Sequence, residues 1–255
     1  MARIFITGSS TGLGLMAGQL LAEQGHRVVL HARSDARAAE THRALPKAEA
    51  VVVGDLTTIA GMRAVADTSN RLGRFDAVIH NAAVSYREPR SETEDGLPHV
   101  FATNALAPYV LTALIQRPAR LIYLSSGMHH GARLYLDDLV WKKRRWSGSE
   151  AYAESKLHNV LLAFAVARLW PDVLSNALEP GWVPTRMGGA GAPDDIDQAH
   201  RTQAWLAASD DAKAQVTGHY FFHMRRREPN PEVHDVALQD ALMEVFAKVS
   251  GVRLV

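Results

Sequence analysis

The sequence predicts an α/β fold: a doubly wound, mostly parallel seven-stranded sheet flanked by helices on both faces. Short apolar, β-branched runs alternate with helix-length stretches, which implies parallel strands joined by crossover helices. A glycine-rich turn connects the first of these runs to the first of the stretches. The 255 residues are 47% hydrophobic and 22% charged, as in an ordinary globular protein.

The elements follow each other in regular order. The predicted strands are 3–7, 27–31, 49–53, 77–80, 120–125, 174–179 and 219–222. The predicted helices are 12–24, 36–44, 59–72, 98–116, 151–170, 195–209 and 233–249. Since neither a Pro/Gly/Ser-rich linker nor a repeat interrupts them, we expect 1–255 to form one domain. Segments 127–150 and 186–195 break the alternation after a strand, where such sheets bind ligands, and are expected to be substrate loops.

Composition excludes several classes of protein. The chain has no cysteine, which rules out disulfides, thiolate metal sites and cysteine nucleophiles. Its 28 basic residues against 27 acidic ones argue against general attraction to nucleic acid or membranes. The first strand begins at residue 3, without a leader peptide, and no apolar run is long enough to span a bilayer. We therefore expect a soluble, cytoplasmic protein.

The glycine-rich turn is a candidate phosphate-binding site. It comes directly after the first strand and opens the first helix, where unpaired N–H groups and the helix dipole favour an anion. Glycine there permits a tight turn and a close approach by a pyrophosphate. This context predicts a Rossmann-type dinucleotide site. The residues involved are Thr7, Gly8, Ser10, Thr11, Gly12, Leu13 and Gly14.

The end of the second strand distinguishes NADP from NAD. An acidic residue there would bind the ribose 2′-hydroxyl, whereas an arginine accommodates a 2′-phosphate. The chain has Arg33 and no acid at the strand end, so NADP is favoured and NAD is less expected. Asp35 is a competitor, but we expect it to be the N-cap of the next helix.

Two further strand ends carry candidate cofactor contacts. Asp55 and Leu56 follow the third strand, and Asp55 could accept a hydrogen bond from the adenine amine. Asn81, Ala82 and Ala83 follow the fourth strand, where small side chains would let the backbone approach the ribose. Each of these residues taken singly is more often a turn or cap residue.

Tyr152 and Lys156 are the candidate acid–base pair. Their spacing of four places both side chains on one helical face. A tyrosine of pKa ~10 is a poor acid or base at neutral pH, and a neighbouring ammonium would lower its pKa into the working range. Such pairs also occur by chance on helix surfaces, so the context has to decide.

The whole chain resembles the short-chain dehydrogenase/reductase family. The glycine turn, the 81–83 segment, Asn104, the Ser125-Ser126 pair, Tyr152/Lys156 and the 180–185 segment occur in that family's order. The long interval between serine and tyrosine, with 137–139, 146–148 and 155–161, is similar to the retinol-dehydrogenase-like branch and its soluble bacterial-type reductases.

The resemblance implies roles for individual residues. Tyr152 would be the proton donor or base, Lys156 would lower its pKa and hold the nicotinamide ribose, and Ser126 would bind the substrate oxygen, with Ser125 as the alternative. Asn104 would hold a water in the proton relay. The residues expected to clasp the nicotinamide are Pro180, Gly181, Val183 and Thr185.

The expected function is an NADP(H)-dependent oxidoreductase, of the carbonyl reductase or alcohol dehydrogenase type. The alternative is an NADP-sensing regulatory protein without turnover, although such proteins typically lose the tyrosine or lysine. A sugar-nucleotide epimerase is disfavoured by glycine spacing and chain length. We expect no metal, because the histidines form no ligand motif. The basic run 142–145 is expected to be a solvated insert rather than a nucleic-acid site.

The substrate is expected to be a lipophilic ketone or aldehyde. Aromatic and thioether side chains in and around the substrate loops would make the pocket apolar, with His129 and His130 near the substrate. The side chains proposed for this lining are Tyr135, Trp141, Trp146, Trp182 and Met187. The resemblance also implies a homo-oligomer, a dimer or tetramer, through helices 98–116 and 151–170.

Overall fold

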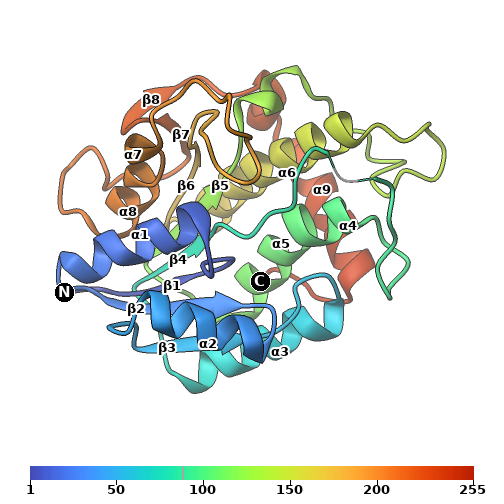
Figure 1. Ribbon diagram of the computed structural model, residues 1–255. Helices are drawn as coiled ribbons and strands as arrows, with labels where there is room; N and C mark the ends of the chain where they lie inside the picture. Colours follow the sequence, from blue (N-terminus) through green and yellow to red (C-terminus); the bar gives the residue numbers. More distant parts are fainter. Residues whose placement is uncertain (88) are drawn as a thin grey trace.

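The computed structural model describes residues 1–87 and 89–255, which form one eight-stranded sheet with helices on both faces (Figure 1). The strand order is β3-β2-β1-β4-β5-β6-β7-β8. The strands are β1 (Arg3–Ile6), β2 (Arg27–Ala32), β3 (Ala50–Val53), β4 (Ala77–His80), β5 (Arg120–Leu124), β6 (Leu174–Glu179), β7 (His219–Phe222) and β8 (Arg225–Arg227). The first seven are parallel, as the alternating pattern predicts, and their carboxyl ends share one edge.

The prediction of seven strands misses β8, which pairs antiparallel with β7 at the sheet edge. The two strands are joined by His223 and Met224, whose φ angles of 46° and 60° are those of a tight hairpin turn. Glycine or asparagine normally marks such a turn, and an all-arginine strand shows no apolar alternation. The sequence therefore carries no ordinary signal for this strand.

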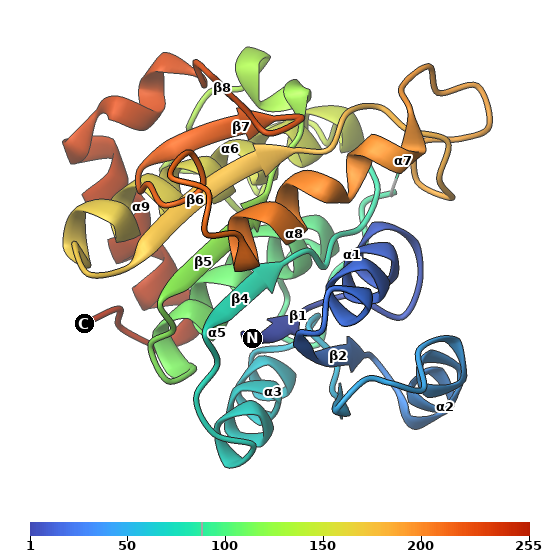
Figure 2. The same ribbon diagram turned by 90° about the vertical axis from the view of Figure 1, so that its left-hand side faces the viewer.

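Each face of the sheet is covered by its own set of helices. The helices are α1 (Gly12–Glu23), α2 (Asp35–Ala44), α3 (Ile59–Arg71), α4 (His99–Phe101), α5 (Ala107–Leu114), α6 (Gly148–Leu169), α7 (Ile196–Ala199), α8 (Arg201–Ala208) and α9 (Val236–Ser250). Helices α1 and α8 bury apolar residues against one face. Helices α3, α5 and α6 cover the other, and α9 packs outside α6 (Figure 2).

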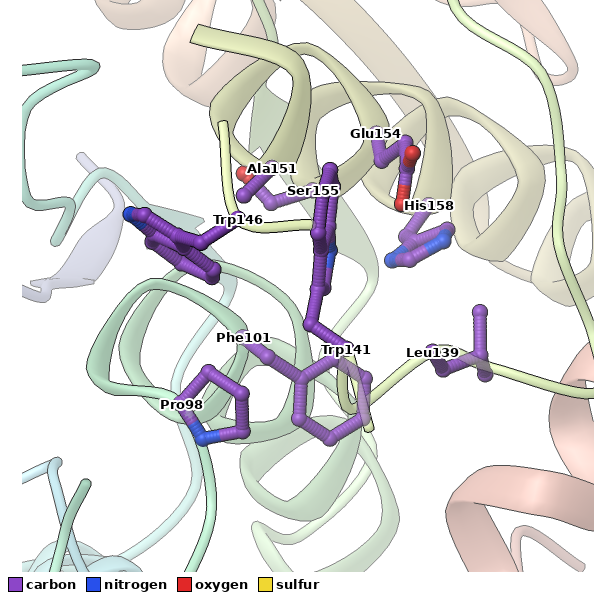
Figure 3. A pocket seen from close by; sticks show the side chains of 9 residues that line it. All are labelled: Pro98, Phe101, Leu139, Trp141, Trp146, Ala151, Glu154, Ser155 and His158. Carbon is purple, nitrogen blue, oxygen red and sulfur yellow. The ribbon is translucent and has the colours of Figure 1, made fainter. Parts of the chain in front are cut away.

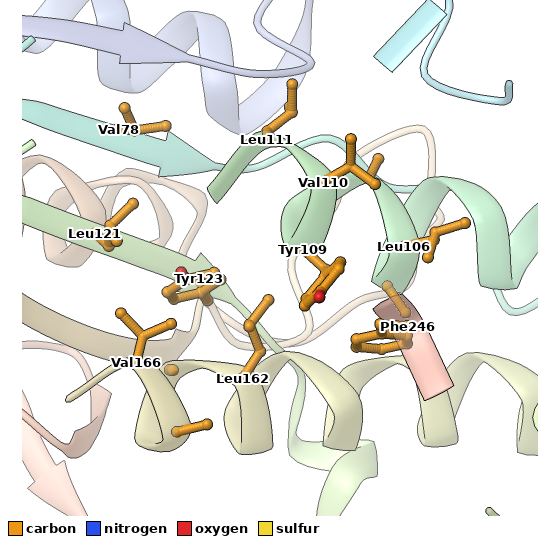
Figure 4. Packing of buried hydrophobic residues seen from close by; sticks show 14 of the residues in the cluster. Val78, Leu106, Tyr109, Val110, Leu111, Leu121, Tyr123, Leu162, Val166 and Phe246 are labelled. Carbon is orange, nitrogen blue, oxygen red and sulfur yellow. The ribbon is translucent and has the colours of Figure 1, made fainter. Parts of the chain in front are cut away.

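The larger core lies between the sheet and α5, α6 and α9 (Figure 4). Tyr109 of α5 packs against Phe246 of α9, with the ring centroids 5.1 Å apart and the ring planes tilted by 49°. The Tyr109 hydroxyl donates to the Val252 carbonyl at 2.9 Å. This packing ties the chain's end to the helix layer beside the site.

Three predicted helices are divided differently in the structure. The predicted helix 98–116 is α4, a π-helical turn η1 (Ala102–Leu106) and α5. The predicted helix 195–209 is α7 and α8, and 233–249 begins with the 3-10 turn η3 (Pro231–His234) before α9. Ser34, not Asp35, is the N-cap of α2: the Ser34 hydroxyl accepts from the Arg37 N–H at 3.4 Å. Asp35 is the first helical residue, where its charge complements the helix dipole.

The two helices expected to form an oligomer interface are already covered within the chain. Residues 107–112 of α5 and 154–166 of α6 are buried, largely by α3, the sheet and α9. A homo-oligomer would therefore have to use other surfaces. Within residues 1–87 and 89–255, no helix combines the length and apolarity needed to cross a membrane.

Several histidines are buried in ways that disfavour their charged form. Burial lowers the pKa of His80 and His158 to about 3 and that of His129 to about 4, and it also lowers the pKa of His31. Arg144 adds to the effect at His158 through charge repulsion. Because the unfolded chain protonates these residues near pH 6.5, it binds more protons than the folded chain below that pH.

We expect the free energy of unfolding to fall as the pH drops from 7 to 5, by about 2 kcal/mol for each of His80, His129 and His158. Urea denaturation at both pH values measures this. In His158→Leu the difference between the two pH values should shrink by about that amount. The exposed His42 of α2 provides the control. An unchanged pH difference in His158→Leu would contradict the assignment.

Candidate active site

The predicted motifs come together at the carboxyl ends of the parallel strands, where a pocket of about 510 Å³ opens. Ser126 and Tyr152 line it, together with Leu13 from the glycine turn and the segment after β6. Its complete lining is Leu13, Tyr86, Ser125, Ser126, Gly127, Met128, Tyr152, Glu179, Pro180, Gly181, Trp182, Val183, Thr185, Met187, Gly188, Asp194, Phe222 and Arg227.

The glycine turn after β1 is locked to the segment after β4. The Asn81 amide donates to the Thr7 and Gly8 carbonyls at 3.0 Å each, and the Thr7 hydroxyl accepts from the Asn81 and Ala82 N–H groups at 3.0 and 3.1 Å. Gly8 has a φ of 60°, and a Cβ on it would lie 2.6 Å from the Ala82 Cα. On Gly14 a Cβ would lie 2.4 Å from the Asn81 Nδ2. The two segments thus require small residues at their contacts.

His31, which the sequence analysis missed, holds the same turn from β2. Its Nδ1 accepts from the Gly8 N–H at 3.0 Å, and its Nε2 lies 2.9 Å from the Gly54 carbonyl. These contacts require the neutral tautomer with the proton on Nε2, in keeping with its lowered pKa. Ser9 completes the link, because its hydroxyl accepts from the His31 N–H at 2.8 Å. The signal was a histidine inside an otherwise apolar strand.

The amino end of α1 is open to an anion. Its N-cap, Thr11, forms no side-chain cap, and Thr11 and Gly12 are exposed while Ser10 is half-buried. Gly12 has a φ of 59°, and a Cβ built on it meets no atom within 4 Å. The unpaired N–H groups of the first turn therefore face space that a ligand can enter.

The residues after β2 and β3 lie on the same edge. Arg33 is exposed directly after β2. The Asp55 side chain is exposed, but its Oδ1 accepts from the Thr57 N–H at 2.9 Å, as a turn residue does. Leu56 is buried in the core beside α3, and only its backbone could contact a ligand.

Helix α6 is fastened to the end of β5 by buried polar contacts. The Lys156 ammonium and the Asn159 amide both donate to the Leu124 carbonyl, at 3.0 and 3.2 Å. In return, the Ser125 hydroxyl donates to the Lys156 carbonyl at 2.9 Å. Ser125 is therefore used within the fold, which leaves Ser126 as the hydroxyl beside the tyrosine.

Tyr152 lies within the pocket wall, with Lys156 beneath it. The Lys156 Nζ is 5.4 Å from the centre of the Tyr152 ring. Burial raises the pKa of Tyr152 to about 12, while its interaction with the Ser126 hydroxyl acts in the opposite direction. Burial also lowers the pKa of Lys156 to about 7. The four-residue spacing suggests that Lys156 lowers the pKa of Tyr152, but in the protein alone burial has the larger effect and raises it. The phenol is therefore protonated at neutral pH.

Asn104 is placed in the π-helical turn η1, an irregularity often found at functional sites. Its amide oxygen accepts from the Val84 N–H at 2.8 Å, and its Nδ2 donates to the Val84 carbonyl and the Ser155 hydroxyl at 3.1 and 3.2 Å. The side chain therefore positions the segment after β4 against α6.

The segment after β6 forms the opposite wall. Gly181 has a φ of 88°, and the Asp194 Oδ2 accepts from the Trp182 N–H at 2.6 Å. Thr185 holds its own turn by accepting from the Gly188 N–H at 3.1 Å. Pro180, Gly181, Val183 and Thr185 all line the pocket.

Several substrate-loop expectations were wrong. Trp182 and Met187 do line the pocket, but Trp141 and Trp146 lie in a separate small cavity with Phe101 and His158, shown in Figure 3. Burial of these rings stabilises the insert before α6. Tyr135 is not in the pocket either; the Arg144 guanidinium lies 4.0 Å from its ring centre.

His129 is a structural residue rather than a substrate contact. It is fully buried, its Nδ1 is 2.7 Å from the Ser126 carbonyl, and its Nε2 accepts from the Asn230 N–H at 3.2 Å. In an extended loop, the side chains of His129 and His130 would point apart. Residues 127–131 instead form a 3-10 turn, η2 (Gly127–Gly131), which places the two rings side by side. The ring centroids are 4.0 Å apart.

The basic run 142–145 is organised around one arginine. Arg144 forms ion pairs with Asp138 at 3.1 Å and with Glu154 of α6 at 2.5 Å, and it also lies over the Trp141 ring. These ion pairs attach the insert to α6. Among residues 1–87 and 89–255, no three His, Asp or Glu side chains are grouped as metal ligands would be.

Part of the pocket lining carries no motif in the sequence: Tyr86, Glu179, Phe222 and Arg227 also line it. Arg227 belongs to a basic run that is visible in the sequence, but its place depends on β8. Tyr86, Glu179 and Phe222 give no local signal of a shared site. Met128 also lines the pocket and lies in the expected substrate loop 127–150.

Comparison with known proteins agrees with this architecture. A family model described as short chain dehydrogenase matches residues 2–129. The uncharacterized oxidoreductase AN7799 of Emericella nidulans is 43% identical, over 99% of this chain and 98% of that protein. Short-chain dehydrogenase chry4 of Gibberella zeae is 39% identical, over 100% and 99%. Retinol dehydrogenase 13 of Homo sapiens is 27% identical, over 98% and 85%.

Solved structures share the fold. A protein of Mycobacterium paratuberculosis superposes with a TM-score of 0.86 at 24% identity, covering 100% of this chain and 95% of that one. A blue fluorescent protein from a metagenomic library, in complex with NADPH, superposes with a TM-score of 0.70 at 20% identity, covering 86% and 95%. By its sequence matches and its fold, the chain belongs to the short-chain dehydrogenase family.

Proposed function

We propose that the protein is an NADP(H)-dependent oxidoreductase that transfers hydride between a nicotinamide and a carbonyl or alcohol substrate. The observation that carries this proposal is the meeting of Ser126 and Tyr152 at a pocket that also reaches the glycine turn through Leu13, with the buried Lys156 ammonium 5.4 Å from the centre of the Tyr152 ring. Tyr152 is the general acid/base, Ser126 binds the substrate oxygen, and Lys156 supports the phenol from below.

The phenol carries the proton that reduction needs, because Tyr152 is protonated at neutral pH. A phenol with a pKa of about 12 is a weak acid, so the proposal requires a positive charge beside it, on Lys156 or on a bound cofactor, to lower that pKa during the reaction. Ser126 adds a second hydrogen bond to that oxygen as charge develops on it. The Lys156 Nζ donates to the Leu124 carbonyl, which holds the buried lysine behind the phenol ring.

The chain's own residues fit a nicotinamide dinucleotide, which when bound supplies the hydride. The uncapped amino end of α1 suits the pyrophosphate. The 180–185 segment suits the nicotinamide carboxamide. The exposed Arg33 after β2 suits a 2′-phosphate, and the strand end carries no acid to bind a free 2′-hydroxyl.

The pocket favours a lipophilic ketone or aldehyde. Tyr86, Met128, Trp182, Met187 and Phe222 supply apolar area on several sides of it. Trp182 is 55% exposed, although its Nε1 is anchored to the Gly188 carbonyl at 3.0 Å. A hydrophobic substrate would cover this ring and gain the corresponding burial energy.

Tyr152→Phe should keep NADPH binding but lower kcat by about 100-fold or more, because the phenol's proton is removed while its ring remains. NADPH consumption over a panel of ketones and aldehydes, with NADPH binding by calorimetry, measures both. Tyr135→Phe, outside the pocket, is the matched control. Near-normal turnover in Tyr152→Phe would sink the mechanism, and NADPH binding without turnover in the wild type would favour the regulatory alternative.

Arg33→Asp should lower the preference for NADPH over NADH by about 10- to 100-fold, the effect of losing a charged hydrogen bond to phosphate. The ratio of kcat/KM for the two cofactors is the measurement. Arg43→Asp on the exposed face of α2 controls for the charge change. A wild-type enzyme that already prefers NADH would show the assignment of Arg33 to be wrong.

His31→Leu should weaken NADPH binding and lower the free energy of unfolding by about 1–3 kcal/mol, because the Gly8 N–H loses its partner. His26→Leu is the matched control. His26 accepts from the Ala2 N–H at 3.0 Å, at the opposite edge of the sheet. His26→Leu should lower the free energy of unfolding, measured by urea denaturation, without weakening NADPH binding, measured by calorimetry. Equal NADPH affinity in the two variants would remove His31 from the binding turn.

A further inference from the structure

One corner of the pocket is polar and is not used by the proposed hydride transfer. Glu179, the last residue of β6, and Arg227, the last residue of β8, both line this corner. The Arg227 Nη1 donates to the Glu179 Oε1 at 2.9 Å. The carboxylate side chain is only 8% exposed, whereas the guanidinium side chain is 50% exposed. The pair is therefore fixed at its acidic end and open at its basic end.

Neighbouring residues hold both members of the pair in place. Gly127 leaves room for the carboxylate, because a Cβ there would lie 2.6 Å from the Glu179 Oε2. The Arg227 guanidinium lies 5.0 Å from the centre of the Phe222 ring, which limits its freedom. The hairpin between β7 and β8 directs Arg227 into the pocket lining, while Arg225 and Arg226 on the same strand are exposed and do not line it.

The chemistry of the pair selects a neutral group. Arginine only donates hydrogen bonds and an ionised carboxylate only accepts them. An anionic substrate group beside Arg227 would also face the Glu179 charge, and a cationic group beside Glu179 would face Arg227. A carboxamide or lactam avoids both repulsions, since its C=O accepts from arginine and its N–H donates to glutamate.

We propose that Glu179 and Arg227 determine substrate specificity by binding a neutral amide or lactam carried by the carbonyl substrate. The inference rests on the proposed function, with Tyr152 and Ser126 at the reacting carbonyl. The apolar side chains between the two ends of the pocket would cover the carbon skeleton that joins the two groups.

The test compares acetophenones that carry a carboxamide, a carboxylate or a methyl group on the ring, meta or para to the ketone. We expect the wild-type enzyme to prefer the carboxamide over the carboxylate by about tenfold or more in kcat/KM. Arg227→Met should lower the carboxamide-to-methyl ratio by about tenfold. Arg226→Met, a matched loss of charge on the same strand, should leave that ratio unchanged.

Glu179→Gln gives the sharper outcome because it reverses the preference. With the carboxylate neutralised, Arg227 becomes an uncompensated cation, so the carboxylate-bearing ketone should gain at least about tenfold relative to the carboxamide. This variant keeps a hydrogen-bond acceptor near Arg227 and therefore remains informative if Arg227→Met folds poorly. A wild-type preference for the carboxylate, or an unchanged ratio in Glu179→Gln, would overturn the inference.

Calorimetry of the three compounds with the NADPH-loaded wild type and variants separates the two proposals. If no ketone is turned over, the proposed function fails, and the binding preferences still decide whether the pair selects an amide. If the ketones are turned over without discrimination, the specificity pair fails while the oxidoreductase stands.

Discussion

The site depends on one buried contact, the hydrogen bond from the Lys156 ammonium to the Leu124 carbonyl. It fixes α6 against the end of β5, and the return bond from Ser125 to the Lys156 carbonyl makes the junction reciprocal. Because Tyr152 is on α6 and Ser126 follows β5, this junction sets the position of the phenol relative to the hydroxyl. Burying a polar lysine is costly unless it is hydrogen-bonded, so its placement has to be accurate.

A second junction joins this site to the glycine turn after β1. Thr7 and Asn81 tie the turn after β1 to the segment after β4, and Asn104 ties that segment to α6 through Ser155. Hydrogen bonds thus link the glycine turn to the segment after β4, and this segment to α6. The hydride transfer proposed above needs its two ends held in one geometry, and junctions of this kind would supply it.

The periodicity of the sequence predicts the parallel sheet because its seven parallel strands are mainly apolar and buried. It also predicts most of the helices, which alternate with these strands. It misses β8, whose three arginines give no strand signal, and the π-helical turn at Asn104, which depends on tertiary packing. The motifs that are continuous in sequence, such as the glycine turn and the Tyr152/Lys156 spacing, could be recognised directly. Glu179 and Arg227 could not, because only the sheet order and the hairpin bring them to the site. His31 stands out as a histidine in a mainly apolar strand, but its bond to the Gly8 N–H follows only from the fold. The prediction that Trp141 and Trp146 line the substrate pocket was wrong, because composition does not show which side of a loop faces the pocket.

Isotope transfer tests the central claim most directly. NADPH carrying deuterium at both C4 positions is incubated with the wild-type enzyme and a ketone that it reduces, and the alcohol is analysed by mass spectrometry and NMR. Direct hydride transfer beside Tyr152 predicts one deuterium on the carbinol carbon and none on the oxygen after exchange in water. An alcohol without deuterium at that carbon, or NADPH oxidation without alcohol formation, would contradict the account.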